Sequence, residues 1–387
     1  MSERIVRRAA RTGPLAALAA LALLAACTSP GGPTPSPTPT ATPTPTATPT
    51  PDPLAGWTLE EKVGQIVMVG LDLTSPQAVS TDVVRDRDVA GIFLHGRSDS
   101  GVDAVRSVVD AATAQAPPGR RVLVAVDQEG GEVQSLSGPG FDDIPSALEQ
   151  GSLDPADLRA RAATWGAQLA AAGVAVDLAP VTDVVPAGTA DQNPPIGGYD
   201  RQYGSTADAV AAHAGAFAEG LADAGVLATS KHFPGLGAVS ADTDTSADVR
   251  DTVTGRDSEQ VAAFGALVDD GVPLVMVSSA VYTLLDPDRP AVFSPEVVDG
   301  LLRDDLGFRG VVITDDLSAA SQVLAWSPGD RAVLAVEAGC DLVLASKDPT
   351  VAPAMLDALL DRARADQKFA ARVEDAARRV LALSGGA

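Results

Sequence analysis

Residues 227–237 read LATSKHFPGLG, and residues 310–317 read GVVITDDL. Both stretches begin with a short apolar run that contains β-branched residues, and both runs stop abruptly on polar and charged residues. This pattern is typical of a buried parallel strand that delivers polar groups at its carboxyl end. We therefore expect chemistry at the place where these two strands end.

Apolar runs of the same kind recur after Leu54, and helical patterns separate them. Strands are expected at residues 64–71, 90–94, 122–126, 175–178, 226–228, 273–277, 310–313 and 341–344. Helices are expected at residues 102–114, 157–172, 207–224, 258–269, 295–305, 330–337 and 353–383. Such alternation predicts an α/β fold with a parallel sheet and crossover helices. Eight units in about 330 residues predict a (β/α)8 TIM-type barrel, and a doubly wound open sheet is the alternative.

Glycines follow five of the expected helices, at positions 173, 225, 271, 307 and 339. The position just after a helix often takes a positive φ, which glycine adopts without a steric penalty. These glycines therefore support the expected helix ends.

The chain begins with a pattern of export. A positively charged start, with arginines at 4, 7, 8 and 11, precedes an apolar run at residues 15–26 that is too short to span a bilayer as a helix. The run ends in Leu24-Ala25-Ala26-Cys27, which resembles the bacterial lipobox, where cleavage before the cysteine accompanies its lipidation. We expect a lipoprotein signal peptide at residues 1–26 and a lipidated Cys27, with an ordinary secretory signal as the alternative.

Residues 27–53 contain almost only Pro, Thr, Ser, Gly and Ala after the cysteine, a composition that does not bury enough surface to fold. This stretch is expected to be a disordered tether, and residues 54–387 the barrel domain. The predicted location is extracytoplasmic, with the lipid in the cell membrane and the domain facing the cell wall.

The net charge of the chain is −23, and it becomes −26 when residues 1–26, which carry four arginines and Glu3, are removed. This acidity argues against nucleic acid or anionic lipid as the main partner, so the membrane is expected to be contacted through the N-terminal lipid alone. Three histidines without a His/Cys cluster indicate no metal site, and no cofactor is expected. Cys340 is interpreted as a small buried apolar residue, and the protein as a monomer.

Polar residues stand where the expected strands end. In a barrel the carboxyl ends of all strands share one face, where active sites of this fold are built. Carboxylates outnumber bases in this set, which suits glycoside hydrolysis with one carboxylate at the anomeric carbon and one proton donor. A sugar-binding barrel, or an aldolase with a Schiff base on Lys231, remains an alternative. The set comprises His95, Asp127, Glu129, Asp177, Asp183, Lys231, His232, Ser278, Ser279, Asp315, Asp316, Ser346 and Lys347.

Three motifs carry a family resemblance: KHFPG at 231–235 with Gly237, VDQEGG at 126–131, and TDDL at 314–317. Together they resemble signatures of glycoside hydrolase family 3, in its single-barrel β-N-acetylhexosaminidase branch, over residues 54 to about 386. The resemblance implies that Asp315 is the nucleophile of a retaining mechanism. It also implies sugar contacts by Asp127, Arg201, Lys231, His232 and Asp183. As an alternative Asp315 caps a helix, although Asp316 is the more natural cap.

The general acid/base is where the chain departs from the pattern. The resemblance implies a histidine after the Pro-Gly turn, but this chain has Leu236-Gly237-Ala238 there and no histidine up to residue 246. Asp242 and Asp244 of the same loop are the candidates, because a carboxyl with a raised pKa can donate to the leaving oxygen. The alternative is that both are solvated loop carboxylates.

A further departure concerns Glu132 and Ser135, which occupy positions where the family commonly has arginines. Contacts to an anionic aglycone are therefore doubtful. The expected function is an exo-acting retaining β-glycosidase that hydrolyses O-glycosyl bonds, namely a β-N-acetylhexosaminidase that releases terminal N-acetylglucosamine from cell-wall glycan fragments. Another β-glycosidase, such as a glucosidase, and a catalytically impaired glycan-binding barrel are the alternatives.

Overall fold

A computed structural model of the protein describes residues 52–383. The predicted signal peptide, Cys27 and nearly all of the predicted tether lie outside the described residues, so these three expectations stay predictions. Within residues 52–383, no helix combines the length and the apolar character needed to cross a lipid bilayer.

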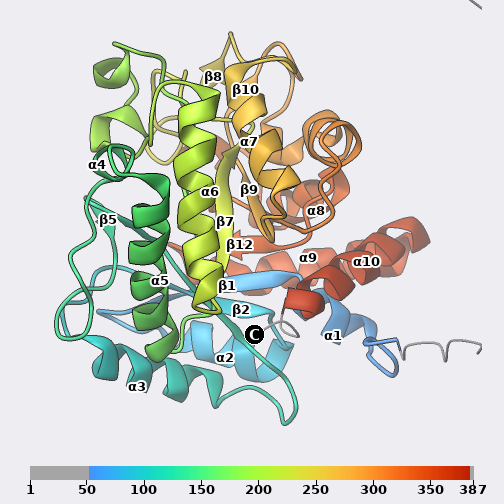
Figure 1. Ribbon diagram of the computed structural model, residues 1–387. Coiled ribbons are helices and arrows are strands. Elements are labelled where there is room, and N and C mark those ends of the chain that lie inside the picture. The colour runs from blue at the N-terminus through green and yellow to red at the C-terminus, as the bar shows by residue number, and fades with distance from the viewer. Residues whose placement is uncertain (1–51, 384–387) are drawn as a thin grey trace, which may run out of the picture. The chain divides into compact units, whose positions relative to one another are not determined.

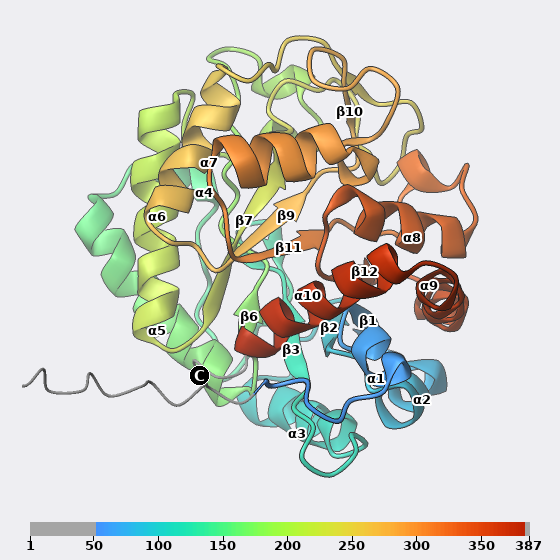
Figure 2. The same ribbon diagram turned by 90° about the vertical axis from the view of Figure 1, so that its right-hand side faces the viewer.

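Eight parallel strands form a closed ring (Figures 1 and 2). Their order in the sheet is β11-β9-β7-β6-β3-β2-β1-β12, and a parallel bridge between Ile313 and Leu342 joins the two ends. The backbone N of Thr314 donates to the carbonyl oxygen of Leu342 at 3.0 Å across this closure. The (β/α)8 barrel is therefore confirmed, and the open sheet is excluded. The strands are β1 (Val67–Asp72), β2 (Gly91–His95), β3 (Leu123–Val126), β6 (Val176–Asp177), β7 (Leu227–Phe233), β9 (Leu274–Val277), β11 (Val311–Thr314) and β12 (Val343–Ala345).

Helices surround the strands, as Figure 2 shows. Ser, Thr or Asp precedes several of them and accepts a backbone N–H of the first turn, which fixes where the helix begins. The helices are α1 (Leu59–Gly64), α2 (Ala78–Arg87), α3 (Val102–Thr113), α4 (Ala147–Gln150), α5 (Pro155–Ala171), α6 (Ala207–Asp223), α7 (Glu259–Asp269), the π-helical η4 (Glu296–Asp305), α8 (Pro328–Ala338), α9 (Ala352–Ala365) and α10 (Gln367–Leu383). Short 3-10 turns are η1 (Ala190–Gln192), η2 (Gly197–Tyr199), η3 (Ala291–Phe293), η5 (Ser321–Val323) and η6 (Pro349–Val351).

The single helix expected at residues 353–383 is wrong, because α9 and α10 are separate. Asp366 between them has an extended backbone, with φ −139° and ψ 114°, and its Oδ1 accepts the backbone N–H of Lys368 at 2.8 Å. A short acidic side chain competes with the helical backbone in this way, and here it ends one helix and starts the next.

The glycines at 173, 225, 271, 307 and 339 all have positive φ, between 74° and 119°. The expectation that each of them ends a helix is thus confirmed. Each of these helices ends before a strand or, after residue 307, before the loop into β11.

Small elements escaped the sequence analysis. These are α1, α2, α4, the antiparallel pair β4 (Gln128–Gly130) and β5 (Val133–Gln134), and the pair β8 (Arg250–Asp251) and β10 (Val281–Tyr282). The paired strands are two or three residues long, too short to display a hydrophobic period. They belong to the loops at the carboxyl ends of the barrel strands, where they shape the site.

The barrel interior and its outer face are separate apolar layers. Strand residues that point inward, such as Met68, Leu274 and Val311, form the inner cluster, and α10 adds buried Val380 to it. Many of these residues are the first of their strands. The packing of Val380 against them shows that α10 covers the amino-terminal end of the barrel (Figure 2). Asp52 is paired with Arg378 of α10, at 3.2 Å. The described chain thus starts at the end of the barrel opposite to the strands' carboxyl ends.

Candidate active site

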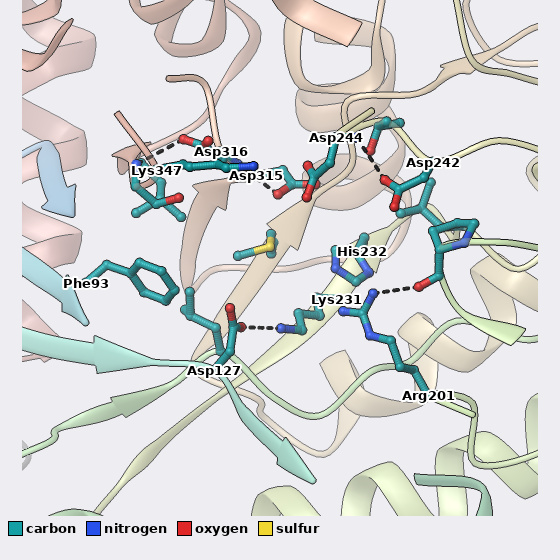
Figure 3. A pocket seen from close by; sticks show the side chains of 17 residues that line it. Phe93, Asp127, Arg201, Lys231, His232, Asp242, Asp244, Asp315, Asp316 and Lys347 are labelled. Carbon is teal, nitrogen blue, oxygen red and sulfur yellow. Dashed lines mark hydrogen bonds and ion pairs between the residues drawn. The ribbon is translucent and has the colours of Figure 1, made fainter. Parts of the chain in front are cut away.

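A cavity of about 170 Å³ opens at the carboxyl ends of the barrel strands (Figure 3). Seven of the predicted site residues line it: Asp127, Arg201, Lys231, His232, Asp242, Asp244 and Asp315. Asp316, Ser346 and Lys347, which were expected at strand ends on this face, line it as well. The sequence analysis did not single out the remaining lining residues, which are Phe93, Leu178, Pro195, Leu236, Thr243, Met276 and Leu344. The structure therefore brings together side chains from β2, β7, β9 and β12 and from the segments that follow β3, β6, β7, β11 and β12.

Lys231 and His232 are neighbours in β7, yet both line the cavity. In a regular strand, successive side chains point to opposite faces. Here the pairing of β7 with β9 shifts register, because Lys231 is paired with Met276 and Phe233 with the next residue, Val277. His232 is the extra residue of this β-bulge, which redirects the side chain toward the cavity.

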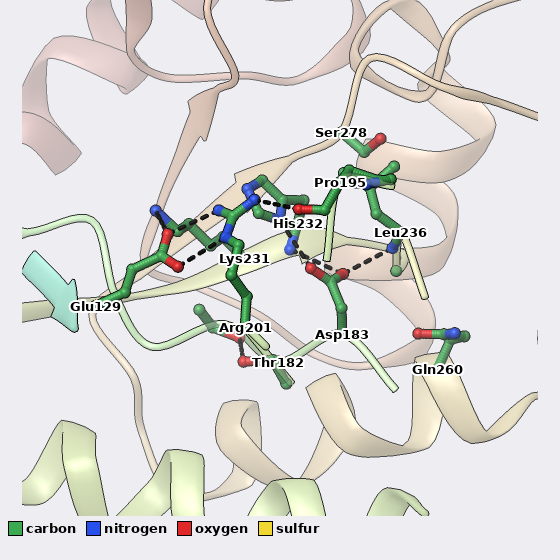
Figure 4. A network of polar contacts seen from close by, with 12 residues as sticks. Glu129, Thr182, Asp183, Pro195, Arg201, Lys231, His232, Leu236, Gln260 and Ser278 are labelled. Atoms are coloured by element: carbon green, nitrogen blue, oxygen red, sulfur yellow. Dashed lines mark hydrogen bonds and ion pairs between the residues drawn. The ribbon is translucent and has the colours of Figure 1, made fainter. Parts of the chain in front are cut away.

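Lys231 is the centre of a charged cluster at one wall of the cavity (Figure 4). Its side chain is buried, and its Nζ lies 2.6 Å from Asp127 Oδ1 and 2.6 Å from Glu129 Oε1. Arg201 donates two hydrogen bonds to the same Glu129, from Nε to Oε2 at 2.8 Å and from Nη2 to Oε1 at 2.7 Å. It donates a third bond, from Nη1, to the carbonyl oxygen of Pro195 at 2.7 Å. Glu129 therefore fixes the orientation of both cations.

The charges of this cluster are stable at neutral pH. Burial opposes the ionisation of Glu129, but Arg201 and Lys231 outweigh it and lower its pKa to about 2. Burial also opposes the charge on Lys231, and Asp127 and Glu129 outweigh this effect, so the pKa of Lys231 is raised. A Schiff base requires a neutral amine. Because the raised pKa keeps the Lys231 amine protonated, the aldolase alternative is not supported.

Asp183 lies behind His232 and does not line the cavity (Figure 4). Its Oδ2 is 2.8 Å from His232 Nδ1, and its Oδ1 accepts the backbone N–H groups of His232 at 3.2 Å and Leu236 at 2.7 Å. The expectation of a direct sugar contact by Asp183 is thus not supported, because this carboxylate is fully buried and accepts its hydrogen bonds from His232 in β7 and from Leu236 in the turn after it. With Nδ1 on Asp183, Nε2 is the nitrogen of His232 that remains for a ligand.

Asp315 directly follows β11, and its backbone N donates to the carbonyl oxygen of Val277 at 3.1 Å. Its Oδ1 accepts the backbone N–H of Asp316 at 2.8 Å. Burial raises the pKa of Asp315, while His232 and Lys231 act in the opposite direction. The carboxyl of Asp315 therefore lies at the cavity wall with a raised pKa, and it interacts electrostatically with His232 and Lys231.

Asp316 accepts backbone N–H groups of the turn that follows β11, and neither Asp315 nor Asp316 is the N-cap of a helix. The Oδ1 of Asp316 accepts the backbone N–H and the hydroxyl of Ser318, at 2.8 and 2.6 Å, and the backbone N–H of Ser346 at 2.9 Å. Its Oδ2 accepts from Ala319 N at 3.1 Å. The next helix, α8, has its own cap, Ser327. These bonds make Asp316 a tie between the segments after β11 and β12, and they leave Asp315 without a capping role.

Asp244 stands at the mouth of the cavity, in the loop of residues 242–246 (Figure 3). The residue is exposed as a whole, but the protein around its carboxyl removes water, and Asp315, Asp242 and then Asp316 repel its negative charge. Lys347 opposes these effects only in part, so the pKa of Asp244 rises to about 7. A carboxyl that still holds its proton near neutral pH is what a general acid requires.

Asp242 has a different environment, because its Oδ1 accepts the backbone N–H of Asp244 at 2.8 Å. This bond closes a turn of the kind that Asp side chains commonly form. Of the two candidates for the acid/base, Asp244 has the environment of a proton donor, and Asp242 shapes the turn that presents it.

The cavity floor is apolar, and the sequence analysis gave it no role. Phe93, Leu178, Met276 and Leu344 line it, and all four also belong to the inner cluster of the barrel. Their inward positions on the strands were the available signal. Asp177, also at a strand end, is fully buried outside the lining, and burial raises its pKa to about 8.

Comparisons with known proteins give a consistent result. The family described as "Glycosyl hydrolase family 3 N terminal domain" matches residues 58–383. A β-hexosaminidase of Alkalilimnicola ehrlichii is 34% identical over 307 residues, which cover 76% of this chain and 84% of the relative. A β-N-acetylhexosaminidase of Beutenbergia cavernae, known as a crystal structure, is 54% identical with a TM-score of 0.84, covering 85% of this chain and 98% of that one. A family 3 β-N-acetylglucosaminidase structure from a Paenibacillus species is 31% identical with a TM-score of 0.76, covering 85% and 62%.

Proposed function

Given that the chain belongs to glycosyl hydrolase family 3, we propose that it is an exo-acting retaining β-glycosidase and, within that class, a β-N-acetylhexosaminidase. One observation carries the assignment of roles: the carboxyls of Asp244 and Asp315 share one cavity and interact electrostatically, and the cationic cluster of Lys231 and Arg201 lies at its wall. A pair of carboxyls with separate roles is the arrangement that most glycoside hydrolases use.

In the first step, a carboxylate oxygen of Asp315 attacks C1 of the terminal sugar while Asp244 transfers its proton to the glycosidic oxygen. The bond from C1 to that oxygen breaks, the aglycone leaves as an alcohol, and a glycosyl ester on Asp315 forms. In the second step, ionised Asp244 removes a proton from water, the water oxygen bonds to C1, and the Asp315 carboxylate is released. The sugar leaves with its anomeric configuration retained.

The remaining residues bind the sugar. Asp127, Arg201, Lys231 and His232 are proposed to hold its hydroxyls and N-acetyl group, with His232 acting through Nε2 and Asp183 acting only by orienting His232. The apolar floor of Phe93, Met276 and Leu344 closes the cavity below. A closed cavity accepts the end of a glycan rather than its middle, which supports exo action.

We further propose that the substrate is a cell-wall glycan fragment with a terminal N-acetylglucosamine. The names of the relatives support the amino sugar, and the predicted export signal supports work outside the cytoplasm. Residues 1–26 and Cys27 would then serve lipid anchoring at the cell membrane, with the domain toward the wall. Substituting Cys27→Ala and following incorporation of a labelled fatty acid tests this, and incorporation that persists in the variant contradicts it.

Aryl β-glycosides test the activity itself. Turnover of an aryl β-N-acetylglucosaminide is expected, and Asp315→Asn should reduce it by more than about 1,000-fold, because an amide is a poor nucleophile toward C1. Faster turnover of the matching glucoside would establish the glucosidase alternative. Binding of N-acetylglucosamine without turnover of either aryl glycoside would establish the glycan-binding barrel.

A further inference from the structure

The 242–246 loop, which carries Asp244, is hydrogen-bonded to the segment that follows the nucleophile. Ser321 donates to the carbonyl oxygen of Asp244 twice, from its backbone N at 3.1 Å and from its Oγ at 2.9 Å. The backbone N of Gln322 donates to the carbonyl oxygen of Thr243 at 3.1 Å. These three bonds join the loop of the proposed proton donor to the segment of Asp315.

Both ends of the surrounding chain are also fixed. Before the loop, the buried side chain of Asn193 donates to the carbonyl oxygens of Leu236 at 2.7 Å and Val239 at 2.9 Å. After the loop, the side chain of Gln322 accepts the backbone N–H of Val249 at 2.7 Å and donates to its carbonyl oxygen at 3.4 Å. The position of Asp244 between these ends therefore depends on Ser321 and Gln322.

We propose that Ser321 and Gln322 are positioning residues for acid/base catalysis, which hold the carboxyl of Asp244 at a fixed place opposite Asp315. The inference rests on the proposed role of Asp244 and adds the device that sets its geometry. Proton transfer to the glycosidic oxygen requires donor and acceptor within about 3 Å, so a small displacement of the loop lowers the rate steeply. Ser321 and Asp315 lie in the same loop between β11 and α8, so this loop carries Asp315 and, through Ser321, also holds the chain at Asp244.

Loss of these bonds has an electrostatic consequence as well. A released loop takes Asp244 toward bulk water and away from the negative charges of Asp315, Asp242 and Asp316, as well as from the positive charge of Lys347. Burial and the negative charges dominate, so the pKa of Asp244 falls toward the usual value for an aspartate. The acid is then ionised at a lower pH.

Ser321→Pro is a sharp test, because proline lacks both the hydroxyl and the backbone N–H. Ser321 is the first residue of η5, and Ala320 before it is extended with ψ 123°, so proline suits this position. The value of kcat/KM for a phenyl β-N-acetylglucosaminide should fall about 10- to 100-fold. For the dinitrophenyl glycoside, whose leaving group needs little protonation, it should fall less than about 3-fold. The basic limb of the pH profile should move to lower pH.

Two further variants complete the experiment. Ser321→Ala removes only the Oγ bond, and it should change the ratio of the two substrates in the same direction by a smaller factor. Ser240→Ala is the matched control, since Ser240 is exposed on the same stretch and its side chain makes no hydrogen bond within residues 52–383. The control should leave both substrates and the pH profile unchanged.

The results separate the inference from the proposed function. Asp244→Ala in the same series should discriminate between the two leaving groups, and failure to do so would refute Asp244 as the acid. If Asp244→Ala discriminates but Ser321→Pro reduces both substrates equally or not at all, the positioning role alone is overturned. If Ser321→Pro does not fold, the substrate ratio of Ser321→Ala decides in its place.

Discussion

Asp244 and Asp315 are two acidic groups of the same type, and their surroundings give them different tasks. Burial raises the pKa of Asp315, but His232 and Lys231 act in the opposite direction and favour its ionised form. Burial and the neighbouring carboxylates act in the same direction on Asp244 and favour its protonated form. The two residues interact, so they titrate as a pair rather than independently.

This arrangement predicts a bell-shaped pH dependence of kcat/KM with its maximum on the acidic side of neutrality. Activity should decline above about pH 7 as Asp244 ionises, and it should decline at low pH as Asp315 takes up a proton. A pH series with the phenyl glycoside measures both limbs. In Asp244→Asn with the dinitrophenyl substrate, the basic limb should disappear, and a basic limb that persists there would assign it to another group.

Glu129 makes a second prediction, which concerns stability. Its pKa of about 2 in the folded protein lies below the ordinary 4.5, so its contribution is fully present above about pH 4.5 and is lost as the pH falls toward 2. Glu129→Gln leaves buried Lys231 and partly buried Arg201 short of a counter-charge and should cost about 3 kcal/mol of unfolding free energy at pH 7. Urea unfolding from pH 7 to 3 should show a smaller pH dependence in the variant, and equal slopes would contradict the prediction.

At the level of elements, the ends of the barrel strands were predictable from the sequence, and the contacts between them were not. Short β-branched runs that stop on polar residues identified Asp127, Lys231, His232 and Asp315, because parallel strands end at one face. The position of Asp183 behind His232 depends on the bulge in β7, and the bulge depends on pairing with β9. Pairing register is a tertiary property that a single strand sequence does not carry.

The turn after β7 illustrates how tightly such loops pack, and it yields a prediction. A Cβ on Gly237 would lie 1.9 Å from the carbonyl oxygen of Val184. Gly237→Ala must therefore displace the chain that leads to Asp244, and we expect a loss of about 3 kcal/mol together with reduced kcat. Gly198→Ala is the control, because its Cβ would meet only Asn193 O, at 3.6 Å. Thermal unfolding of both variants is the measurement, and equal midpoints would refute the argument.

For the whole molecule, the division of labour between the two ends of the barrel is the main feature. The carboxyl ends of the strands hold the cavity, and α10 covers the opposite end with the buried Val380. The eight strand and helix units of the sequence predicted the barrel. The sequence pattern also predicted a single helix in place of α9 and α10, so it did not predict that α10 covers the amino-terminal end of the barrel. The break depends on the local hydrogen bond that the backbone N–H of Lys368 donates to the Asp366 side chain, and hydrophobic periodicity carries no signal of such a bond.

Val380→Ala tests the separation of stability from activity. Removing two methyl groups from the inner cluster should lower the unfolding free energy by about 2 kcal/mol. The values of kcat and KM at 25 °C should stay within about 2-fold of the original, since the change lies at the end of the barrel away from Asp315. Urea unfolding and initial-rate kinetics measure the two effects, and a large fall in kcat without a change in stability would contradict the assignment.

The ion pair of Asp52 with Arg378 has a practical consequence for handling the enzyme. It places Asp52 beside α10, at the amino-terminal end of the barrel. A purification tag or a solid support joined directly ahead of Asp52 would therefore leave the molecule at that end. Large, insoluble glycans can then approach the cavity at the carboxyl ends of the strands without contacting the support. Immobilisation through the amino-terminal side is accordingly the orientation in which a column of this protein would retain its capacity for polymeric material.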